Sequence, residues 1–498
     1  MRLAVCIPPS TFLPNDRVFP YLGPVQVATA ARDLAGWDVR VLDLTGHALR
    51  CSAPSSSTEN ESARGALIGA VSSQRFEDHT APDCVEEVWR NAEREIAAAP
   101  ADVYGFYALS CQVHETMRLL DLVRRHWPKA RTVLGGPHVA MAPDAAALLG
   151  FDHVVADLGG GGGGEAPFLR LLRRISLGLD VPKIVRAKPG DATLAHWPWP
   201  DRSLIDIRSY DYRLLGEKTA TIVSQRGCSY GCDFCSHTQF YRRVEFRDID
   251  HVRAELRELR ETYGYRAVML YDDETNLRRD HFEALCRALH EGGWIWRCFI
   301  KSNLFTDEQA RMAAESGAVQ LCTGAESANA EIKHNIKKKS TIDDDTRFVQ
   351  LCLKYSIAPK CFSMLGVAGE SRDTAYELRD WLLARVEDGL VDFDVTVMTP
   401  YPGTELYDAL MAAGEYKPSS RHGLRLVKRP DFAGSTVHYK TRPGAYVAMT
   451  ETFDPSTGKV LCTSADLVAL RDEVDRDVRA AVMKRRARSV VVNAAGEG

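Results

Sequence analysis

The sequence predicts an α/β protein made of two successive units, a doubly wound parallel sheet and a partial, TIM-like (β/α)6 barrel, followed by a small mixed region. Short apolar runs alternate with stretches of helical period over residues 1–180, and the same alternation resumes over residues 216–405, as parallel sheets require. Between the two units, Trp197-Pro198-Trp199-Pro200 is typical of a linker, because each proline biases the residue before it toward extended backbone.

The first unit, residues 1–180, has enough strand candidates for a Rossmann-like sheet, which binds its ligand at the carboxyl ends of its strands. A polar, serine-rich stretch at residues 46–85 interrupts the pattern. We interpret this stretch as a flexible excursion, with a lid over a bound ligand as the alternative. Strands are expected at Leu3–Ile7, Val39–Leu44, Val103–Ser110, Thr132–Gly135 and His153–Ala156, and helices at Val25–Leu34 and His114–Arg125.

The second unit follows a linker at residues 181–215 and has six strand–helix repeats, so its chemistry is expected at the carboxyl ends of its strands. Residues 406–498 are expected to cap the substrate site and to end in a charged helix at Ser464–Arg485. Strands are expected at Thr221–Ser224, Ala267–Tyr271, Arg297–Lys301, Val319–Thr323, Lys360–Leu365 and Asp392–Thr399, and helices at Val252–Tyr263, Arg279–Glu291, Asp307–Ser316, Thr341–Tyr355 and Arg372–Glu387.

Composition narrows the class of protein. Hydrophobic residues make up 45% of the 498 residues and charged residues 26%, which is the balance of a soluble globular protein. The formal net charge of −4 gives no strongly basic face for nucleic acid, and no apolar run reaches the ~18 residues of a membrane span. The 13 cysteines are scattered and odd in number and follow no secretory signal, so we expect a reduced, cytoplasmic protein. Most of them are expected in the core: Cys286, Cys298, Cys352 and Cys361.

One group of cysteines is clustered. Cys228, Cys232 and Cys235 have C-x3-C-x2-C spacing directly after the first barrel strand. Cysteine thiolates are the usual ligands of iron–sulfur clusters, and three of them leave one iron of a 4Fe-4S cluster open to another ligand. A structural zinc site is the alternative, but it needs four ligands, and the nearest spare donor, His237, lies very close to Cys235 in the chain. Three unconnected core cysteines are a further alternative.

These motifs resemble the radical SAM superfamily from about Thr219 to Leu406. The resemblance implies that the three clustered cysteines bind a 4Fe-4S cluster, whose open iron binds S-adenosylmethionine. It also implies that segments at successive strand ends contact this cofactor. The positions carried over to this chain are Asp272 near the methionine amino group, Glu326 and Ser327 in a Gly-x-Glu-Ser stretch, and Gly366 at the end of the fifth strand.

The first unit resembles the cobalamin-binding domain that precedes this barrel in one subgroup. The segment Gly135-Gly136-Pro137-His138 ends a strand, and Ser110 ends the preceding one. The resemblance implies that these five residues lie near the corrin ring; a plain strand-to-helix turn is the alternative.

Two features of this unit depart from cobalamin enzymes. The Asp-x-His-x-x-Gly motif is missing, so we expect no imidazole beneath the cobalt and a structural His138. The run Gly159–Gly164 stands where relatives have Gly-Glu-Gly-Glu, which puts the role of that carboxylate in doubt.

Asp273 and Glu274 follow Asp272 and are the candidate catalytic residues. Relatives carry a small or aromatic residue at the position of Glu274. A carboxylate there could occupy the open iron and prevent S-adenosylmethionine from chelating it; a solvated or cofactor-bonded carboxylate is the alternative. A cobalamin-dependent tryptophan methylase of this subgroup is understood to work without forming a radical, which gives the first interpretation a precedent.

The resemblance implies transfer of a methyl group from S-adenosylmethionine through methylcobalamin to a carbon of a small molecule, such as an amino acid or natural-product precursor. Alternatives within the subgroup are non-radical methylation of an aromatic carbon, as in a tryptophan-like substrate, and cyclisation or ring contraction without methylation. A non-enzymatic binding protein and a methylthiotransferase are disfavoured. An electron donor such as flavodoxin or ferredoxin is the expected partner, with no nucleic acid or membrane. Several residues either line a substrate pocket or lie at the surface: Tyr416, Arg421, His422, Tyr439 and Tyr446.

Overall fold

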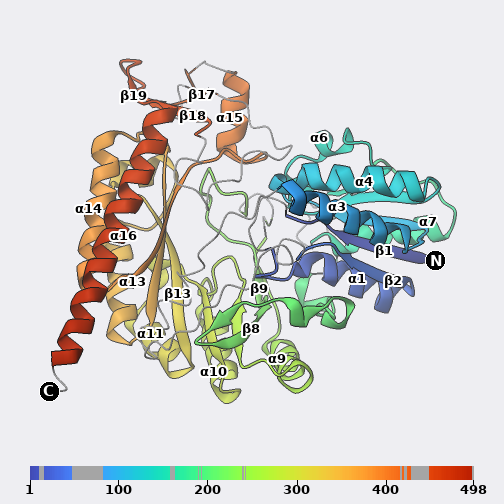
Figure 1. The fold of residues 1–498 in the computed structure, drawn as a ribbon, viewed down its shortest axis with the longest axis horizontal. Coiled ribbons are helices and arrows are strands. Elements are labelled where there is room, and N and C mark those ends of the chain that lie inside the picture. Colours follow the sequence, from blue (N-terminus) through green and yellow to red (C-terminus); the bar gives the residue numbers. More distant parts are fainter. Residues whose placement is uncertain are drawn as a thin grey trace.

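The computed structural model confirms the two α/β units, which lie side by side in Figure 1 with the barrel on the left. Within the described residues, no helix is both long and apolar enough to span a membrane. The structure describes residues 1–10, 16–46, 82–156, 163–188, 190–191, 193–237, 241, 243–414, 418–419, 423–427 and 448–495.

The N-terminal unit is a parallel sheet of order β2-β1-β3-β4-β5-β6. Helices α1 (Leu22–Ala35) and α7 (Glu165–Ser176) pack on one face, and α3 (Pro82–Ala97) and α4 (Val113–His126) pack on the other. β1 lies between β2 and β3, so the order in which successive strands are added to the sheet reverses between β1 and β3. Doubly wound folds bind their ligands at such a point. The strands are β1 (Arg2–Ile7), β2 (Asp38–Asp43), β3 (Val103–Tyr107), β4 (Arg131–Gly135), β5 (His153–Ala156) and β6 (Ile184–Arg186).

The sixth strand corrects the boundary expected at residue 180. β6 pairs in parallel with β5 from Val154↔Ile184 to Ala156↔Arg186, so the first unit extends to at least Arg186. Sequence pattern alone leaves this stretch in the linker, because three residues are too few to show a period of two.

The second unit is a curved sheet of order β15-β14-β13-β12-β11-β8-β7. Six strands are parallel, as expected for a partial (β/α)6 barrel, and β7 (Arg213–Leu214) adds an antiparallel edge. The parallel strands are β8 (Glu217–Ile222), β11 (Ala267–Leu270), β12 (Ile295–Phe299), β13 (Ala318–Glu326), β14 (Ala358–Leu365) and β15 (Asp392–Val397). The helices outside them are α9 (Ile249–Tyr263), α10 (Arg279–Glu291), α11 (Asp307–Glu315), α13 (Ile342–Lys354) and α14 (Arg372–Asp388).

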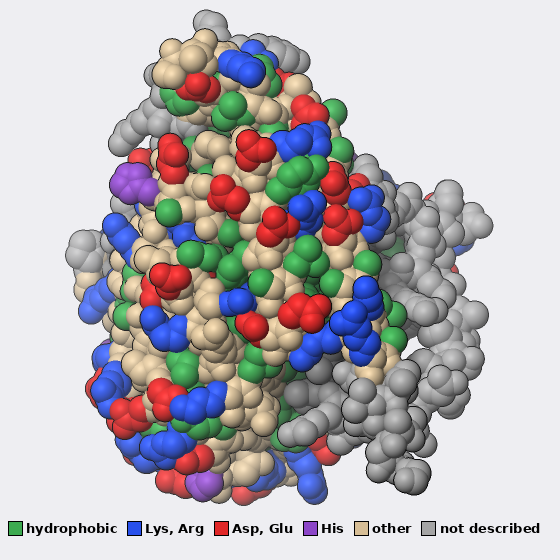
Figure 2. All heavy atoms as spheres, turned by 90° about the vertical axis from the view of Figure 1, so that its left-hand side faces the viewer, with side chains coloured by type: hydrophobic (Ala, Val, Ile, Leu, Met, Phe, Trp, Pro, Cys, Tyr) green, Lys and Arg blue, Asp and Glu red, His purple; other side chains and the backbone are tan. Residues whose placement is uncertain are grey.

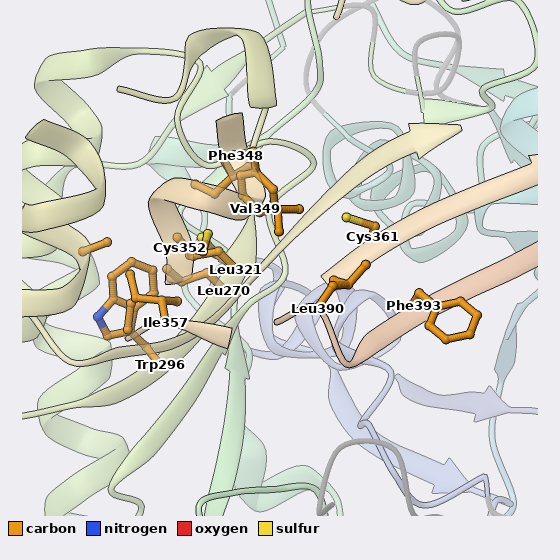
Figure 3. Close-up of a cluster of buried hydrophobic side chains, with 14 of the residues drawn as sticks. Leu270, Trp296, Leu321, Phe348, Val349, Cys352, Ile357, Cys361, Leu390 and Phe393 are labelled. Carbon is orange, nitrogen blue, oxygen red and sulfur yellow. The ribbon is translucent and has the colours of Figure 1, made fainter. Parts of the chain in front are cut away.

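The barrel core lies between its strands and its outer helices. Side chains of alternate strand positions, such as Trp296, Leu321 and Phe393, pack there with Phe348 of α13 (Figure 3). Since successive side chains point to opposite faces of a strand, the remaining positions face the inside of the barrel. The four cysteines expected in the core are buried in this cluster, which confirms their structural role: Cys286, Cys298, Cys352 and Cys361.

The C-terminal region forms a four-stranded antiparallel sheet, β16-β17-β18-β19, and a helix longer than expected. This helix, α16 (Ser464–Ala495), packs along α14 and β15 (Figure 1). On this side of the molecule, acidic and basic side chains are interspersed (Figure 2), so this face offers no basic patch for nucleic acid. The strands are β16 (Pro418–Ser419), β17 (Leu424–Leu426), β18 (Thr450–Phe453) and β19 (Val460–Cys462).

Candidate cofactor site

A short antiparallel pair holds the two ends of the cysteine loop together. After β8 ends at Ile222, the chain forms β9 (Gln225–Arg226), which pairs with β10 (Glu245–Phe246) beyond the loop. Gly227 begins the loop with φ 88°, and a Cβ there would overlap the carbonyl of Arg243. Only glycine fits this position, so the backbone path into the cysteines is tightly defined.

Two neighbouring carboxylates at the end of β11 fasten this loop. Asp272 is buried and accepts hydrogen bonds from Ser224 N (2.6 Å), Ser224 Oγ (2.5 Å) and Gln225 N (3.0 Å). Burial raises its pKa to about 6. Its hydrogen bonds hold the end of β8, so in this structure Asp272 acts as a positioning residue; contact with a cofactor remains a prediction.

Asp273 binds both ends of the cysteine motif. Its Oδ2 accepts a hydrogen bond from Gly227 N (2.5 Å), one residue before Cys228, and its Oδ1 pairs with Nδ1 of His237, two residues after Cys235. Loss of solvent around the ring, part of which stays exposed, would lower the pKa of His237, but the Asp273 carboxylate outweighs it and raises that pKa. Metal-binding histidines are commonly held by a carboxylate on one ring nitrogen, so this contact does not decide against His237 as a fourth zinc ligand.

The three cysteines are free thiols; Cys232 is buried, and Cys228 and Cys235 are partly exposed. Within the described residues, no group of three or more His, Cys, Asp or Glu side chains is arranged around one metal ion, so a cluster held by the three cysteines remains a prediction, as does the structural zinc alternative. Burial raises the pKa of the free Cys228 thiol to about 11, so this sulfur stays protonated near neutral pH until a metal displaces the proton.

Charged side chains surround these thiols. Glu274 is partly buried and has Oε1 3.9 Å from Nζ of Lys301, which lies 4.2 Å from the ring centre of Tyr230 in the cysteine loop. Burial raises the pKa of Glu274, and the Lys301 and Lys338 ammonium groups oppose this shift. The Glu274 carboxylate also raises the pKa of the Cys228 thiol, which agrees with the expected position of Glu274 beside the cysteines.

The other strand-end residues lie along the same rim. Glu326 has φ 63° at a register shift between β13 and β14, and its Oε1 is 3.1 Å from Lys338 Nζ. Ser327 is buried, and its Oγ accepts a hydrogen bond from Asn329 N. Gly366 has φ 88° and donates its N–H to Glu370. Of these three, Glu326 is the residue whose side chain contacts Lys338, one of the two lysines whose charge acts on Glu274 beside the cysteines. Cofactor binding by any of the three remains a prediction.

A cavity of about 600 Å³ lies between the two units, within the range of small-molecule sites. Gly135, Gly136 and Pro137 line it from the carboxyl edge of the first sheet, and His237 and Asp273 line it from the barrel. Gly136 has φ 104°, and a Cβ there would lie 2.8 Å from the Ala108 carbonyl oxygen. Glycine is therefore needed at this position because the neighbouring backbone leaves no room for a Cβ, whether or not a ligand also approaches it.

Ser110 and His138 are not among the residues that line this cavity. Ser110 Oγ lies 3.1 Å from His138 Nδ1, and burial lowers the pKa of His138 to about 4. This placement favours the structural interpretation of His138, and the corrin contacts predicted for both residues remain predictions.

An ion pair between the two units was missed by the sequence analysis. Glu165, at the start of α7, pairs at 2.8 Å with Arg226, which immediately precedes Gly227. Glu165 is buried, Arg226 is partly buried, and both line the cavity. Glu165 is the carboxylate directly after the glycine run, and its position there was the only signal of this contact in the sequence; the role of the carboxylate that relatives carry within the run is still in doubt. Other predictions fall outside the described residues: most of residues 46–85, Gly159–Gly162, Tyr416, Arg421, His422, Tyr439 and Tyr446.

Comparisons with known proteins agree with this arrangement. Residues 222–382 match the radical SAM superfamily. The chain is 26% identical over 325 residues to an uncharacterized methyltransferase of Pyrococcus horikoshii, covering 62% of this chain and 70% of the relative. It is 25% identical to the anaerobic magnesium-protoporphyrin IX monomethyl ester cyclase of Rubrivivax gelatinosus (64% and 60%). It is 24% identical to the cytidylyl-2-hydroxyethylphosphonate methyltransferase of Streptomyces wedmorensis (61% and 65%). The chain thus spans less than two thirds of the length of the last two.

Solved structures show the same fold over most of the chain. The radical S-adenosylmethionine methyltransferase TsrM from Kitasatospora setae, with cobalamin and a 4Fe-4S cluster bound, superposes with a TM-score of 0.63 at 18% identity, covering 96% of this chain and 88% of TsrM. The cobalamin-dependent radical enzyme OxsB, with aqua-cobalamin and S-adenosylmethionine bound, gives 0.53 at 14% identity, covering 82% and 55%. This chain therefore contains a radical SAM domain, and it has the overall fold of the cobalamin-dependent radical SAM enzymes.

Proposed function

We propose that this protein is a cobalamin-dependent radical SAM methyltransferase, which moves a methyl group from S-adenosylmethionine through cobalamin to a carbon of a small molecule. The observation that carries the proposal is the continuous cavity that Gly135 and Gly136 line at one end and His237 and Asp273 line at the other. A group bound at the edge of the first sheet would face the cysteine loop across this cavity. The methyltransferase relatives and the fold of TsrM support the same conclusion.

The cysteine loop and the glycine-lined edge of the cavity support a place for each cofactor. Cys228, Cys232 and Cys235 supply three thiols on a loop that is fastened at both ends, which suits a 4Fe-4S cluster with one open iron. Bound at these places, the cluster would supply an electron to S-adenosylmethionine and cobalamin would carry the methyl group. An electron donor such as flavodoxin or ferredoxin would then be needed.

The chain's own residues would position these groups and exclude water. Asp272 and Asp273 hold the loop by their hydrogen bonds. The buried ammonium groups of Lys301 and Lys338 lie beside Glu274 and Glu326, so they would offset negative charge next to the cluster. The C-terminal region is proposed to cap the substrate site.

A second candidate is non-radical methylation of an aromatic carbon. One observation that favours it is Glu274, whose carboxylate is close enough to Cys228 to influence its pKa and could occupy the open iron. Another is a row of aromatic rings, Tyr271, Phe299 and Phe362, with successive centroids 6.3 and 6.0 Å apart. Phe299 and Phe362 alternate with core residues of β12 and β14 and so face the inside of the barrel. The cyclase relative supports a further alternative, cyclisation without methylation.

Anaerobic purification followed by reconstitution with iron, sulfide and hydroxocobalamin tests the proposal. We expect the absorbance of a 4Fe-4S cluster and tightly bound cobalamin. With a panel of candidate substrates that includes L-tryptophan, the product should gain the mass of one methylene. Release of 5′-deoxyadenosine with the product supports the radical route, and methylation without it supports the second candidate. A protein that takes up zinc but neither iron nor cobalamin would contradict the proposal.

A further inference from the structure

The Arg226 side chain joins the start of the cysteine loop to two helices of the first unit. Its Nη2 donates to Glu165 Oε1 of α7 at 2.8 Å and to Gln26 Oε1 of α1 at 3.2 Å. The side chains of Arg226 and Glu165 are 11% and 4% exposed, so salt and water screen this contact little. One guanidinium nitrogen of the barrel thus contacts both helices that cover this face of the first sheet.

The second strand at the base of the loop is also held from outside the barrel. Glu245 of β10 lies opposite Arg226 of β9, and its Oε2 accepts a hydrogen bond from Leu194 N of the linker at 2.8 Å. Glu245 and Leu194 are both buried. The strand that enters the cysteine loop is therefore bonded to the first unit, and the strand that follows the loop is bonded to the linker.

There is little slack between Arg226 and the first thiol. Gly227 follows Arg226 directly, and the Arg243 carbonyl leaves no room for a Cβ there. The N–H of Gly227 is held by Asp273 at 2.5 Å, and Cys228 is the next residue. A displacement of α1 or α7 that carried the Arg226 guanidinium with it would therefore act on the position of Cys228.

The same contact borders the cavity that the proposed function assigns to cobalamin. Gln26, Glu165 and Arg226 line this cavity, as do Gly135 and Gly136 at the edge of the first sheet. A ligand that fills the cavity is therefore placed to restrain both helices and the guanidinium that contacts them. Ordering that is paid for by one ligand does not have to be paid for again by a second, so two such ligands bind cooperatively.

We propose that Arg226 is a positioning residue that couples the two cofactor sites through its ion pair with Glu165. The cluster in the cysteine loop and cobalamin in the cavity each tighten the binding of the other, because both favour the arrangement that this pair holds. The inference rests on the proposed function, since it requires both cofactors. Coupling between two binding sites is reciprocal, so it can be measured from the cobalamin side alone.

Equilibrium titration with hydroxocobalamin, on protein with and without a reconstituted cluster, measures this coupling. In the wild type, the cluster should lower the Kd for hydroxocobalamin about 5-fold or more, the lower end of ordinary coupling between sites. The double variant Glu165→Gln/Arg226→Gln removes the ion pair without leaving an unpaired buried charge, and its two Kd values should agree within about 2-fold. A contact that only stabilises the fold would change both Kd values by the same factor and leave their ratio as in the wild type.

Two further variants complete the test. Arg32→Gln/Asp201→Asn is the matched control, because it removes a 2.6 Å ion pair between α1 and the linker whose residues are not among those that line the cavity. It should keep the wild-type ratio of Kd values. Glu165→Gln alone changes no residue of the barrel, so its cluster uptake should match the wild type, and its ratio should fall to less than about half the wild-type ratio.

The outcomes separate the two proposals. If the wild type takes up no cluster or binds no hydroxocobalamin, the proposed function fails. If the wild type binds both but has the same Kd for hydroxocobalamin with and without the cluster, the proposed function stands and the coupling is wrong. The coupling is equally wrong if Glu165→Gln keeps the wild-type ratio, or if the control pair loses it.

Discussion

Replacing Asp273 by alanine should release the cysteine loop at both ends. The variant loses a charge-assisted hydrogen bond to Gly227 N at 2.5 Å, worth about 1.5–3 kcal/mol. It also loses the ion pair with His237, whose side chain is 58% exposed; a pair this exposed adds about 0–1 kcal/mol. Together these losses come to about 1.5–4 kcal/mol and raise the population of the open loop by about 10- to 700-fold, since ~1.4 kcal/mol corresponds to a factor of 10.

The assay is the rate at which reconstituted, anaerobic protein loses iron to a chelator, followed by absorbance. Asp273→Ala should lose iron at least about 10-fold faster than the wild type, because the ligands are exposed in proportion to the open population. Asp273→Asn keeps an acceptor for Gly227 N and should change the rate only severalfold. The control is Asp250→Ala on α9, whose side chain is 95% exposed and 3.7 Å from Arg253. Equal rates of iron loss in wild type and Asp273→Ala would refute the role assigned to Asp273.

Three further predictions concern single positions. Cys232→Ala should take up no 4Fe-4S cluster, measured as absent charge-transfer absorbance after reconstitution; cluster formation at the wild-type level would show that this thiol is not a ligand. Gly136→Ala forces a Cβ to within 2.8 Å of the Ala108 carbonyl oxygen at φ 104°, so it should destabilise the first unit by about 1–3 kcal/mol in urea unfolding and weaken hydroxocobalamin binding. Burial raises the pKa of Glu370 from 4.5 to about 7, which is above its value in the unfolded chain. The protonated side chain therefore stabilises the fold fully below pH ~4.5, and this stabilisation is lost as the pH rises through ~7. The whole effect is about 3 kcal/mol. Glu370→Gln should remove this part of the pH dependence of unfolding between pH 5 and 8, and an unchanged slope would show that Glu370 does not titrate there.

The local pattern of apolar and polar residues was sufficient to predict most of the helices and strands. The helix expected at Arg279–Glu291 and the strand expected at His153–Ala156 have these bounds in the structure, because strong periodicity over one element is a property of neighbouring residues. Short elements without a period were missed. These include β6, β7, β9 and β10, together with the antiparallel sheet at the C-terminus, and each is defined by the strand beside which it lies.

The spacing of Cys228, Cys232 and Cys235 was enough by itself to predict a cluster loop at the end of the first barrel strand, since eight consecutive residues determine which thiols can converge. Only the tertiary structure decided what fastens that loop. Asp272 and Asp273 are adjacent in the chain, yet one holds the end of β8 and the other holds Gly227 and His237. Likewise Glu165 meets Arg226 across 61 positions of sequence. Such contacts depend on how the two units pack against each other, and no local period encodes that packing.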